Sequence, residues 1–355
     1  MVSRRKILQL TAAGAATAMA PAVLQGATQT PLRVSAYGGM FENALRNSVA
    51  KRFTAETGIA VEIASQGAGD DWLFGIVRAV RSGLTPIDMT MLTPVEVLRS
   101  MKMGRVFQPF TETMANVDKI PSEKLFRYQG QLFGVGMVSW YLALVINPDL
   151  VKSEPTSWRN IFEDEAYRRK ISLNGNYNGG VLEIIANTYF DGTQTLNTSE
   201  GLDAVFAKMA DISPQVKFWW TAESQMEQAL RNGDVIAGTY FHDVANLLKN
   251  DGFPIQSTFP KEGAYIGTGQ YTMLASTKKT AECHAFVNFC AQPDIQAIFA
   301  REMRLSPTLP NDLVGLSETE FNLVGTDIPP IYPAGKLMAG KVSLLQRKWQ
   351  RTLSG

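Results

Sequence analysis

The order strand, helix, strand at the start of the mature chain is the feature that most constrains the fold. Residues 31–37 and 59–63 are short runs whose apolar residues predict strands. Between them apolar side chains recur every four residues, a helical stripe made of Phe41, Leu45, Val49 and Phe53. Gly58 is a typical helix terminator. A strand–helix–strand unit is the signature of a mostly parallel sheet, so the predicted fold class is α/β.

A second informative stretch lies in the last third of the chain, where the apolar run at residues 235–241 leads into His242 and Asp243. In an open α/β sheet, ligands bind where strands end and helices begin. The ring of Phe241 and the carboxylate of Asp243 would both attract a cation at such a place. Taken alone, the more common roles are core packing for the ring and capping of the next helix for the acid.

Two further segments are candidates for contact with a ligand. A loop rich in Asn and Gly, which includes Asn174 and Asn176, follows the predicted strand at residues 170–173. It is either a ligand-facing loop or a flexible connector, since glycines let backbone and polar side chains approach a bound molecule. Trp219 and Trp220 form a tandem pair in a predicted loop. One ring at least is expected to face outward or into a cleft, and the other to pack in the structure.

The first 27 residues have the composition of an export signal. Arg4, Arg5 and Lys6 precede a stretch without charge, and small residues follow towards residue 27. This pattern predicts a cleaved signal over residues 1–27, similar to the twin-arginine type, and therefore a periplasmic protein. The stretch is only mildly apolar and Pro21 interrupts it, so it is a poor transmembrane helix.

Charge and size exclude some classes of protein. Without the three basic residues of the predicted signal, 31 Lys and Arg remain against 33 Asp and Glu, a net charge of −2. This balance argues against nucleic-acid binding, which calls for a basic patch or a high pI. The remaining ~330 residues exceed one ordinary hydrophobic core, so two lobes are expected.

No cofactor, metal site or catalytic set is predicted. Cys283 and Cys290 are about 10 Å apart along a predicted helix, too far for a disulfide within it. With His284 they match no familiar zinc spacing. The chain lacks the Gly-x-Ser-x-Gly elbow of hydrolases. His242 and Asp243 are neighbours in a predicted strand and would point to opposite faces, which suits an acid–base pair poorly. The chain is therefore predicted not to be an enzyme.

The order of these segments resembles the periplasmic solute-binding proteins of the spermidine/putrescine ABC-transporter type, over nearly all of the mature chain. The most specific part is Gly-Asp-Val at residues 233–235 with Gly238, followed by Phe-Pro-Lys-Glu-Gly at 259–263. The other matching phrases are at residues 53–61, 145–147, 157–158, 286–289, 292–294 and 306–308. No single phrase is decisive, but their order is characteristic of that family.

The resemblance implies a two-lobe periplasmic-binding-protein fold, type II-like, with the ligand cleft between lobes joined by crossing strands. We expect residues 32–142 and 244–290 in the N-terminal lobe, and residues 143–243 and 291–355 in the C-terminal lobe. The resemblance also implies a monomer without a cofactor. It would capture a small-molecule solute and deliver it to an ABC permease of the inner membrane.

The resemblance further implies a ligand site, whose expected residues are Tyr37, Gly39, Asn174, Asn176, Trp219, Trp220, Phe241, Asp243 and Gln270. Polyamine binders of that family carry acids in the loop where this chain has Asn174 and Asn176, which leaves Asp243 as the one clear acid. Because a buried unpaired charge is costly, the favoured ligand is a small amine or amino-acid-like compound with one cationic end. Spermidine or putrescine is the alternative. A ferric-ion binder is disfavoured because the chain has no Tyr-Tyr pair.

Overall fold

The computed structural model describes residues 30–67, 69–335 and 340–354, so the export signal expected over residues 1–27 lies outside the described residues. From Pro31 onward the chain packs as one unit. No helix in the described part of the chain has both the length and the apolar character needed to cross a membrane.

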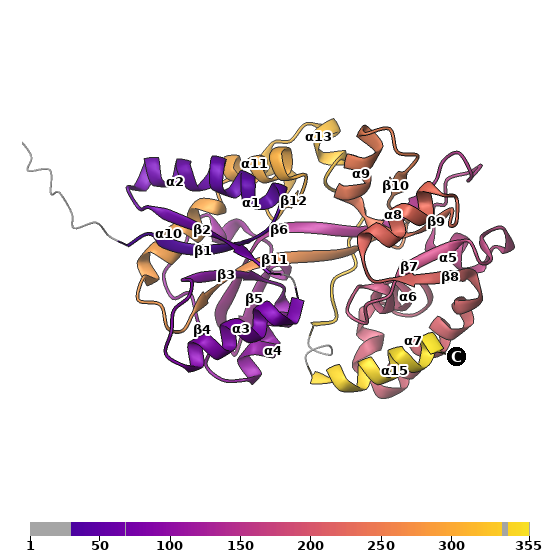
Figure 1. The fold of residues 1–355 in the computed structure, drawn as a ribbon, viewed down its shortest axis with the longest axis horizontal. Coiled ribbons are helices and arrows are strands. Elements are labelled where there is room, and N and C mark those ends of the chain that lie inside the picture. Colours follow the sequence, from indigo (N-terminus) through magenta and orange to yellow (C-terminus); the bar gives the residue numbers. More distant parts are fainter. Residues whose placement is uncertain (1–29, 68, 336–339, 355) are drawn as a thin grey trace, which may run out of the picture. The chain divides into compact units, whose positions relative to one another are not determined.

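The described strands join into one mixed sheet, in the order β2-β1-β3-β11-β6-β9-β7-β8. Strand β1 pairs in parallel with β2 and β3, and β7 pairs in parallel with β8 and β9. Strands β6 and β11 are antiparallel to each other and run from one lobe to the other (Figure 1). The strands are β1 (Leu32–Tyr37), β2 (Val61–Gln66), β3 (Met89–Leu92), β4 (Phe107–Gln108), β5 (Leu125–Tyr128), β6 (Gln131–Ile146), β7 (Ile171–Asn174), β8 (Val216–Trp220), β9 (Ala237–Phe241), β10 (Gln256–Thr258), β11 (Tyr265–Leu274) and β12 (Ser306–Pro307).

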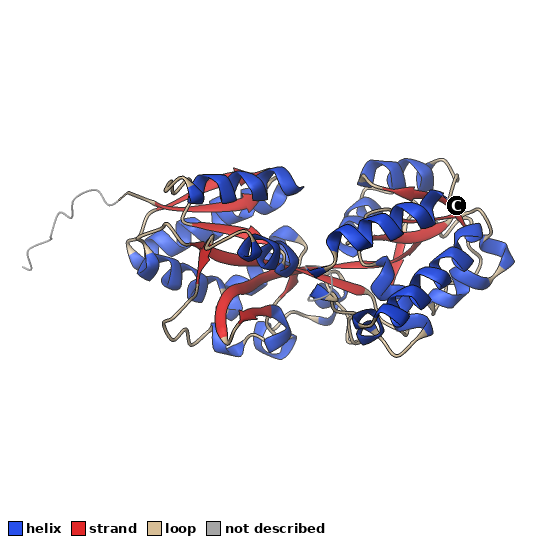
Figure 2. Cartoon of the chain, turned by 90° about the horizontal axis from the view of Figure 1, so that it is seen from below, coloured by secondary structure: helices blue, strands red, loops and turns tan. Residues whose placement is uncertain are grey.

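Helices cover both faces of the strands in each lobe (Figure 2). In the first lobe they are α1 (Met40–Ala44), α2 (Ala50–Thr57), α3 (Gly69–Arg81), α4 (Pro94–Lys102), α10 (Thr280–Cys290) and α11 (Pro293–Met303). In the second lobe they are α5 (Trp158–Glu163), α6 (Val181–Tyr189), α7 (Ser199–Ile212), α8 (Glu223–Arg231), α9 (His242–Asn250) and α15 (Val342–Ser354). Two short helices, α12 (Asn311–Val314) and α13 (Glu318–Asn322), follow β12.

The stripe of apolar residues at four-residue spacing is buried along its whole length, as predicted. Phe41, Leu45, Val49 and Phe53 lie on α1, a π-helical turn at Leu45–Val49, and α2. An α-helix has 3.6 residues per turn, so a spacing of four drifts around its axis. The wider π turn counteracts this drift. Gly58 ends the helix with a φ of 74°, which glycine adopts without strain.

The two lobes have separate hydrophobic cores. In the first core, Phe53 of α2 and Phe286 of α10 meet edge to face with ring centroids 5.1 Å apart. In the second core, Trp158 of α5 and Tyr240 of β9 are fully buried, and Trp349 of α15 closes the outer side. Each core therefore combines helices from distant parts of the sequence.

The lobe boundaries differ from the expected ones. The sequence-based division puts residues 244–290 in the first lobe, yet Ala245 of α9 and Phe253 are buried in the second core. It puts residues 291–355 in the second lobe, yet the buried face of α11 belongs to the first core. The reason is that β10 pairs with β6 next to the second core, and the chain returns to the first lobe only along β11.

Distant pairing shapes two further strands. Residues Gln131–Ile146 form one long continuous strand, β6. The tandem Trp219 and Trp220 lie in strand β8 and not in a loop. In both cases pairing with a distant neighbour, β11 or β7, extends the strand beyond what local pattern indicates.

Candidate functional site

A cleft of about 480 Å³ lies at the ends of strands from both lobes. Tyr37 ends β1 in the first lobe, and Phe241 ends β9 in the second. Val138 and Trp140 reach the cleft from the crossing strand β6. Its other lining residues are Gly38, Phe41, Thr93, Glu96, Glu223, Asp243, Val244, Leu247, Met303 and Leu305. The cleft therefore occupies the position that strand ends mark in α/β proteins.

Aromatic rings form a concave wall of this cleft. The ring of Tyr37 meets that of Trp140 edge to face, with centroids 6.4 Å apart and planes at 87°. Phe41 lies on the other side of Tyr37, 5.9 Å away between centroids. Phe241 contributes a ring from the second lobe. Ring faces attract cations, so this wall suits an ammonium group.

Three carboxylates line the cleft, and none of its described lining residues is basic. Glu96 belongs to the first lobe, whereas Glu223 and Asp243 belong to the second. The expectation of a single clear acid is therefore wrong. Glu96 and Glu223 lie in the first turns of helices that follow strands β3 and β8, and the sheet order brings them to the same cleft as Asp243.

Asp243 lies in the first turn of α9, but it is not the helix cap. The N-cap residue is Phe241, and no side chain caps this helix. The Oδ1 atom of Asp243 is buried and has no hydrogen-bond partner among the described residues. Burial raises the pKa of Asp243 from 3.8 to about 7. A ligand ammonium would supply the positive charge that this carboxylate lacks.

The other two acids differ in their surroundings. Through Oε2, Glu96 accepts hydrogen bonds from the backbone N–H and the hydroxyl of Thr93, at 2.7 and 2.8 Å, in a capping box that fixes the start of α4. Glu223 retains contact with solvent, and partial burial followed by the charge of Glu227 raises its pKa. Burial, with the charge of Glu96 second, raises the pKa of Tyr37 far above its usual value, so its hydroxyl stays protonated.

The Asn174 loop is held by hydrogen bonds within itself and to the neighbouring strands β8 and β9. Oδ1 of Asn174 accepts from the backbone N–H of Asn176 at 2.9 Å and from its side-chain amide at 3.1 Å. Asn174 is buried and Asn176 is exposed, and neither lines the cleft described above. The indole N–H of Trp349 donates to the carbonyl of Gly175 at 2.8 Å, so the C-terminal helix holds this loop.

The remaining expected site residues lie around the cleft rather than in its lining. Trp220 is buried, donates to the carbonyl of Thr239 at 3.0 Å and supports the ring of Phe241 from behind, with centroids 5.9 Å apart. Trp219 packs against the ring of Trp349, 5.7 Å away.

Gln270 and Gly39 also lie outside the lining. Gln270 is buried in β11 and donates to the carbonyl of Lys124 at 3.1 Å. Gly39 precedes α1 with a φ of 73°, next to Gly38, which does line the cleft.

The structure gives His242 a structural role. His242 and Asp243 are the first two residues of α9 and not strand neighbours as expected. Nδ1 of His242 contacts the hydroxyl of Ser257 at 2.9 Å, and Nε2 contacts the carbonyl of Asn322 at 3.2 Å. Burial lowers the pKa of His242 from 6.5 to about 4. The imidazole therefore ties α9 to the end of α13.

The histidine and cysteines of α10 are also part of the packing. Nε2 of His284 accepts from the backbone N–H groups of Thr111 and Glu112, at 3.0 and 3.2 Å. Cys283 and Cys290 are free thiols in the first core. Within the described residues, no three His, Cys, Asp or Glu side chains are grouped so that they would hold a metal ion.

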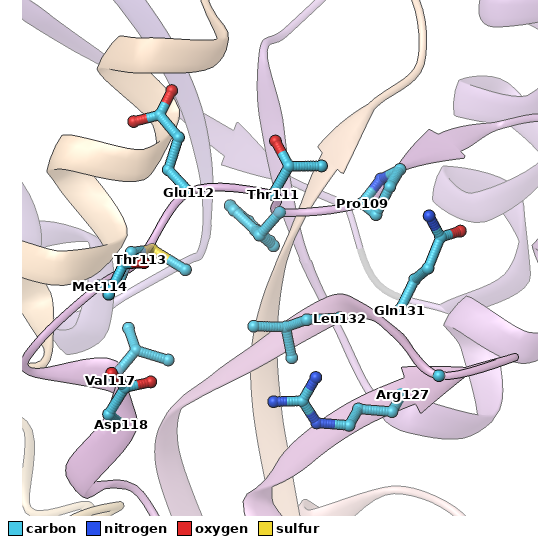
Figure 3. Close-up of a pocket in the computed structure, with 12 residues that line it drawn as sticks. Pro109, Thr111, Glu112, Thr113, Met114, Val117, Asp118, Arg127, Gln131 and Leu132 are labelled. Carbon is cyan, nitrogen blue, oxygen red and sulfur yellow. The ribbon is translucent and has the colours of Figure 1, made fainter.

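A separate hollow of about 440 Å³ lies in the first lobe, between the segment at residues 109–118 and the β5–β6 hairpin (Figure 3). Glu112 and Arg127 are exposed at its edge, and Leu132 lies in its floor. None of the site residues expected from sequence lines it, and all of its lining comes from one lobe. The cleft at Asp243 is therefore the candidate ligand site.

Residues 48–312 match the family of bacterial extracellular solute-binding proteins. The chain belongs to this family. The resemblance inferred from the order of sequence phrases is thereby confirmed, and with it the two-lobe α/β fold.

Two curated relatives of this solute-binding protein have known ligands. The chain is 22% identical over 192 residues to the gamma-aminobutyric acid-binding protein of Pseudomonas aeruginosa. This alignment covers 52% of the chain and 53% of the relative. The chain is 21% identical over 251 residues to the spermidine/putrescine-binding periplasmic protein of Salmonella typhimurium, covering 69% of each. The match to the first relative therefore spans about half of that protein's length.

The fold is similar to that of solved solute-binding proteins. The structure of AttC from Agrobacterium tumefaciens C58, in an open unliganded conformation, aligns with a TM-score of 0.76 at 18% identity. The alignment covers 92% of this chain and all of AttC. At this level of identity the likeness concerns the fold alone.

Proposed function

We propose that this protein is the substrate-binding component of an ABC importer, and that it captures a small amine-bearing solute in the cleft at Asp243. The observation that carries the proposal is the lining of that cleft. Aromatic rings and three carboxylates face it, without a basic side chain among the described lining residues. An unbound cleft of this kind carries negative charge without a partner, which a cationic ligand neutralises.

The carboxylates bear on the number of positive charges in the ligand. Glu96 stands on the first lobe, and Asp243 and Glu223 on the second. A solute with one ammonium group would pair best with Asp243, whose buried oxygen lacks a partner. A diamine or polyamine has more than one ammonium, and the acids on opposite lobes favour it as the second candidate.

The arrangement also supports capture by closure. A ligand that binds groups on both lobes stabilises the form in which they are closer together, by as much as its affinity for the two forms differs. Strands β6 and β11 are the segments along which such a hinge motion would occur. The closed form would then be presented to a membrane permease. Further parts of the proposal are cleavage of the export signal, action as a monomer and a periplasmic location. A relative named as periplasmic supports the location.

Calorimetry with putrescine, spermidine, gamma-aminobutyric acid and butylamine tests the proposal. We expect wild type to bind at least one of these amines, and Asp243→Asn to weaken that binding by at least tenfold, as loss of a charged hydrogen bond implies (~1.5–3 kcal/mol). Asp251→Asn is the matched control, because Asp251 is exposed at the far end of the same helix. Unchanged binding by Asp243→Asn would remove Asp243 from the site. A folded wild type that binds none of the amines would overturn the function.

A further inference from the structure

Strand β11 presents no side chain to the part of the cleft that β6 lines. Trp140 of β6 is paired directly with Gly267 of β11, and Val138 with Gly269. Trp140 and Val138 line the cleft, and the residues opposite them are both glycines. The alternation of strand side chains puts the intervening residue, Thr268, on the other face, where its hydroxyl lies 3.3 Å from that of Ser139.

The indole of Trp140 occupies the space that a side chain at position 267 would need. A Cβ built on Gly267 would lie 2.4 Å from Cε2, 2.4 Å from Nε1 and 2.7 Å from Cζ2 of Trp140. These atoms belong to the rigid ring and not to the end of a flexible chain. The ring therefore lies across the backbone of β11, as a glycine in a strand permits when another group approaches closely.

The comparison with Gly269 shows that this contact is specific. A Cβ at Gly269 would meet Sδ of Met91 at 3.0 Å and a methyl group of Val138 at 3.3 Å. Those side chains have single bonds about which they can turn. Of these two glycines, only Gly267 has a rigid aromatic ring in the place of the missing side chain.

We infer that Trp140 is the floor against which the ligand stacks, and that Gly267 is a positioning residue which holds this floor flat and so sets the depth of the cleft. The inference rests on the proposed function and adds a determinant of specificity to it. Trp140 is half-buried, it lines the cleft, and its ring meets that of Tyr37 in an edge-to-face contact. The indole also lies against the backbone of β11 at Gly267. A cationic or extended amine would lie over that ring.

The contact between Gly267 and the indole of Trp140 indicates how the ring would move if position 267 carried a side chain. Backbone of β11 lies against the indole at Gly267, and the ring lines the cleft. A methyl group at position 267 would therefore push the indole into the cleft, which would become shallower. Longer or bulkier amines would lose affinity first, because they need the full depth.

A double-mutant cycle tests the seating of the ring without any ligand. Gly267→Ala is expected to lower the urea midpoint of unfolding in the presence of Trp140 and to lower it much less in the Trp140→Ala background, where the clash is gone. Gly75→Ala is the matched control, because a Cβ at this helical glycine meets nothing within 4 Å. Equal effects of Gly267→Ala in both backgrounds would overturn the seating role.

Calorimetry with putrescine and spermidine tests the role towards the ligand. We expect Trp140→Ala to weaken binding about tenfold, and Gly267→Ala to weaken spermidine binding more than putrescine binding. If the wild-type protein binds both amines and both variants bind them with unchanged affinity, the inference is overturned and the proposed function stays intact. A wild type that binds neither would overturn the stacking role together with the polyamine candidate, while the folding cycle still decides whether Gly267 seats the ring.

Discussion

The carboxylate of Glu262 lies 2.5 Å from the hydroxyl of Ser157, from which it is separated by 105 positions in the sequence. Its other oxygen accepts from the backbone N–H of Trp158 at 3.2 Å. Ser157-Trp158 and Phe-Pro-Lys-Glu-Gly at residues 259–263 are two of the phrases that carried the family resemblance. The structure shows that they form one contact, in which an acid from a turn satisfies the start of helix α5.

Removal of this acid should destabilise the second lobe. Glu262→Ala leaves the Ser157 hydroxyl and the Trp158 N–H without their acceptor, so we expect a loss of about 2 kcal/mol in the free energy of unfolding, measured with urea. Glu318→Ala is the control, because Glu318 is an exposed glutamate in the first turn of another helix. An equal, small effect of both substitutions would show that the contact contributes little.

Two adjacent residues should make opposite contributions to the pH dependence of stability. Burial raises the pKa of Asp243 to about 7 and lowers that of His242 to about 4. Between these values, the folded protein holds a proton on Asp243 that the unfolded chain has released. It lacks a proton on His242 that the unfolded chain binds up to the usual pKa of 6.5. Stability therefore falls with rising pH through Asp243 and falls with decreasing pH through His242.

Single variants should separate the two contributions. Burial also raises the pKa of Glu183 to about 7, so each variant is compared with wild type. Relative to wild type, we expect Asp243→Asn to lose stability as the pH falls from 6.5 towards 4, by about 1 kcal/mol per pH unit, because the opposing contribution of Asp243 is removed. His242→Gln should show the reverse slope, with stability falling as the pH rises towards 7. Urea unfolding at a series of pH values measures both slopes. Parallel slopes in the two variants would contradict the assignment.

The charge of Glu96 should distinguish ligands with one ammonium group from those with two. Glu96→Gln removes the charge and retains the capping box with Thr93, since Gln also serves at this position. If a diamine spans the lobes, we expect this variant to weaken putrescine binding about tenfold and to leave the binding of butylamine nearly unchanged. Calorimetry compares the two amines, which have the same carbon chain. Equal losses for both would place Glu96 and Asp243 at the same ammonium.

Trp349 should hold the Asn174 loop in place. It is buried, and it donates to the Gly175 carbonyl and packs against Trp219. We expect Trp349→Ala to cost about 3–5 kcal/mol of stability and to increase hydrogen exchange at residues 174–180. Trp349→Phe keeps a ring and loses the N–H donor, so it should cost less. Unchanged exchange in the loop of Trp349→Ala would show that its own bonds and those to Trp220 and Thr239 are sufficient to hold it.

Local pattern was sufficient to predict the α/β class and to pick out three residues that line the candidate cleft. Tyr37, Phe241 and Asp243 follow directly from the rule that ligands bind at strand ends, and all three line the cleft. The stripe at Phe41 and the stop at Gly58 also form as the sequence predicts, because helical periodicity and the conformation of glycine are local properties.

The residues that were missed depend on pairing between distant strands. Trp140 lies in the middle of an apolar strand. Nothing nearby in the sequence shows that its partner in the neighbouring strand is Gly267, whose missing side chain leaves space for the indole ring. Glu96 and Glu223 carry a weaker signal, since each is in the first turn of a helix that follows a strand, but the sheet order decides that they meet. Gln270 lies outside the lining of the cleft, and its side-chain amide donates to the carbonyl of Lys124.

In the sequence, β11 follows the parallel strands of the second lobe and leads the chain back to the first lobe. Helices α10 and α11 come after it and complete much of the first core. On the ribosome, the first lobe therefore lacks part of its core until Val324 has been synthesised. The second lobe lacks Trp349 for longer still. At synthesis rates of about 5–20 residues per second, the nascent chain spends most of its time with apolar faces that have no native partner. The first core is therefore completed only after the strands of both lobes have been made, and the second core only when α15 has been made.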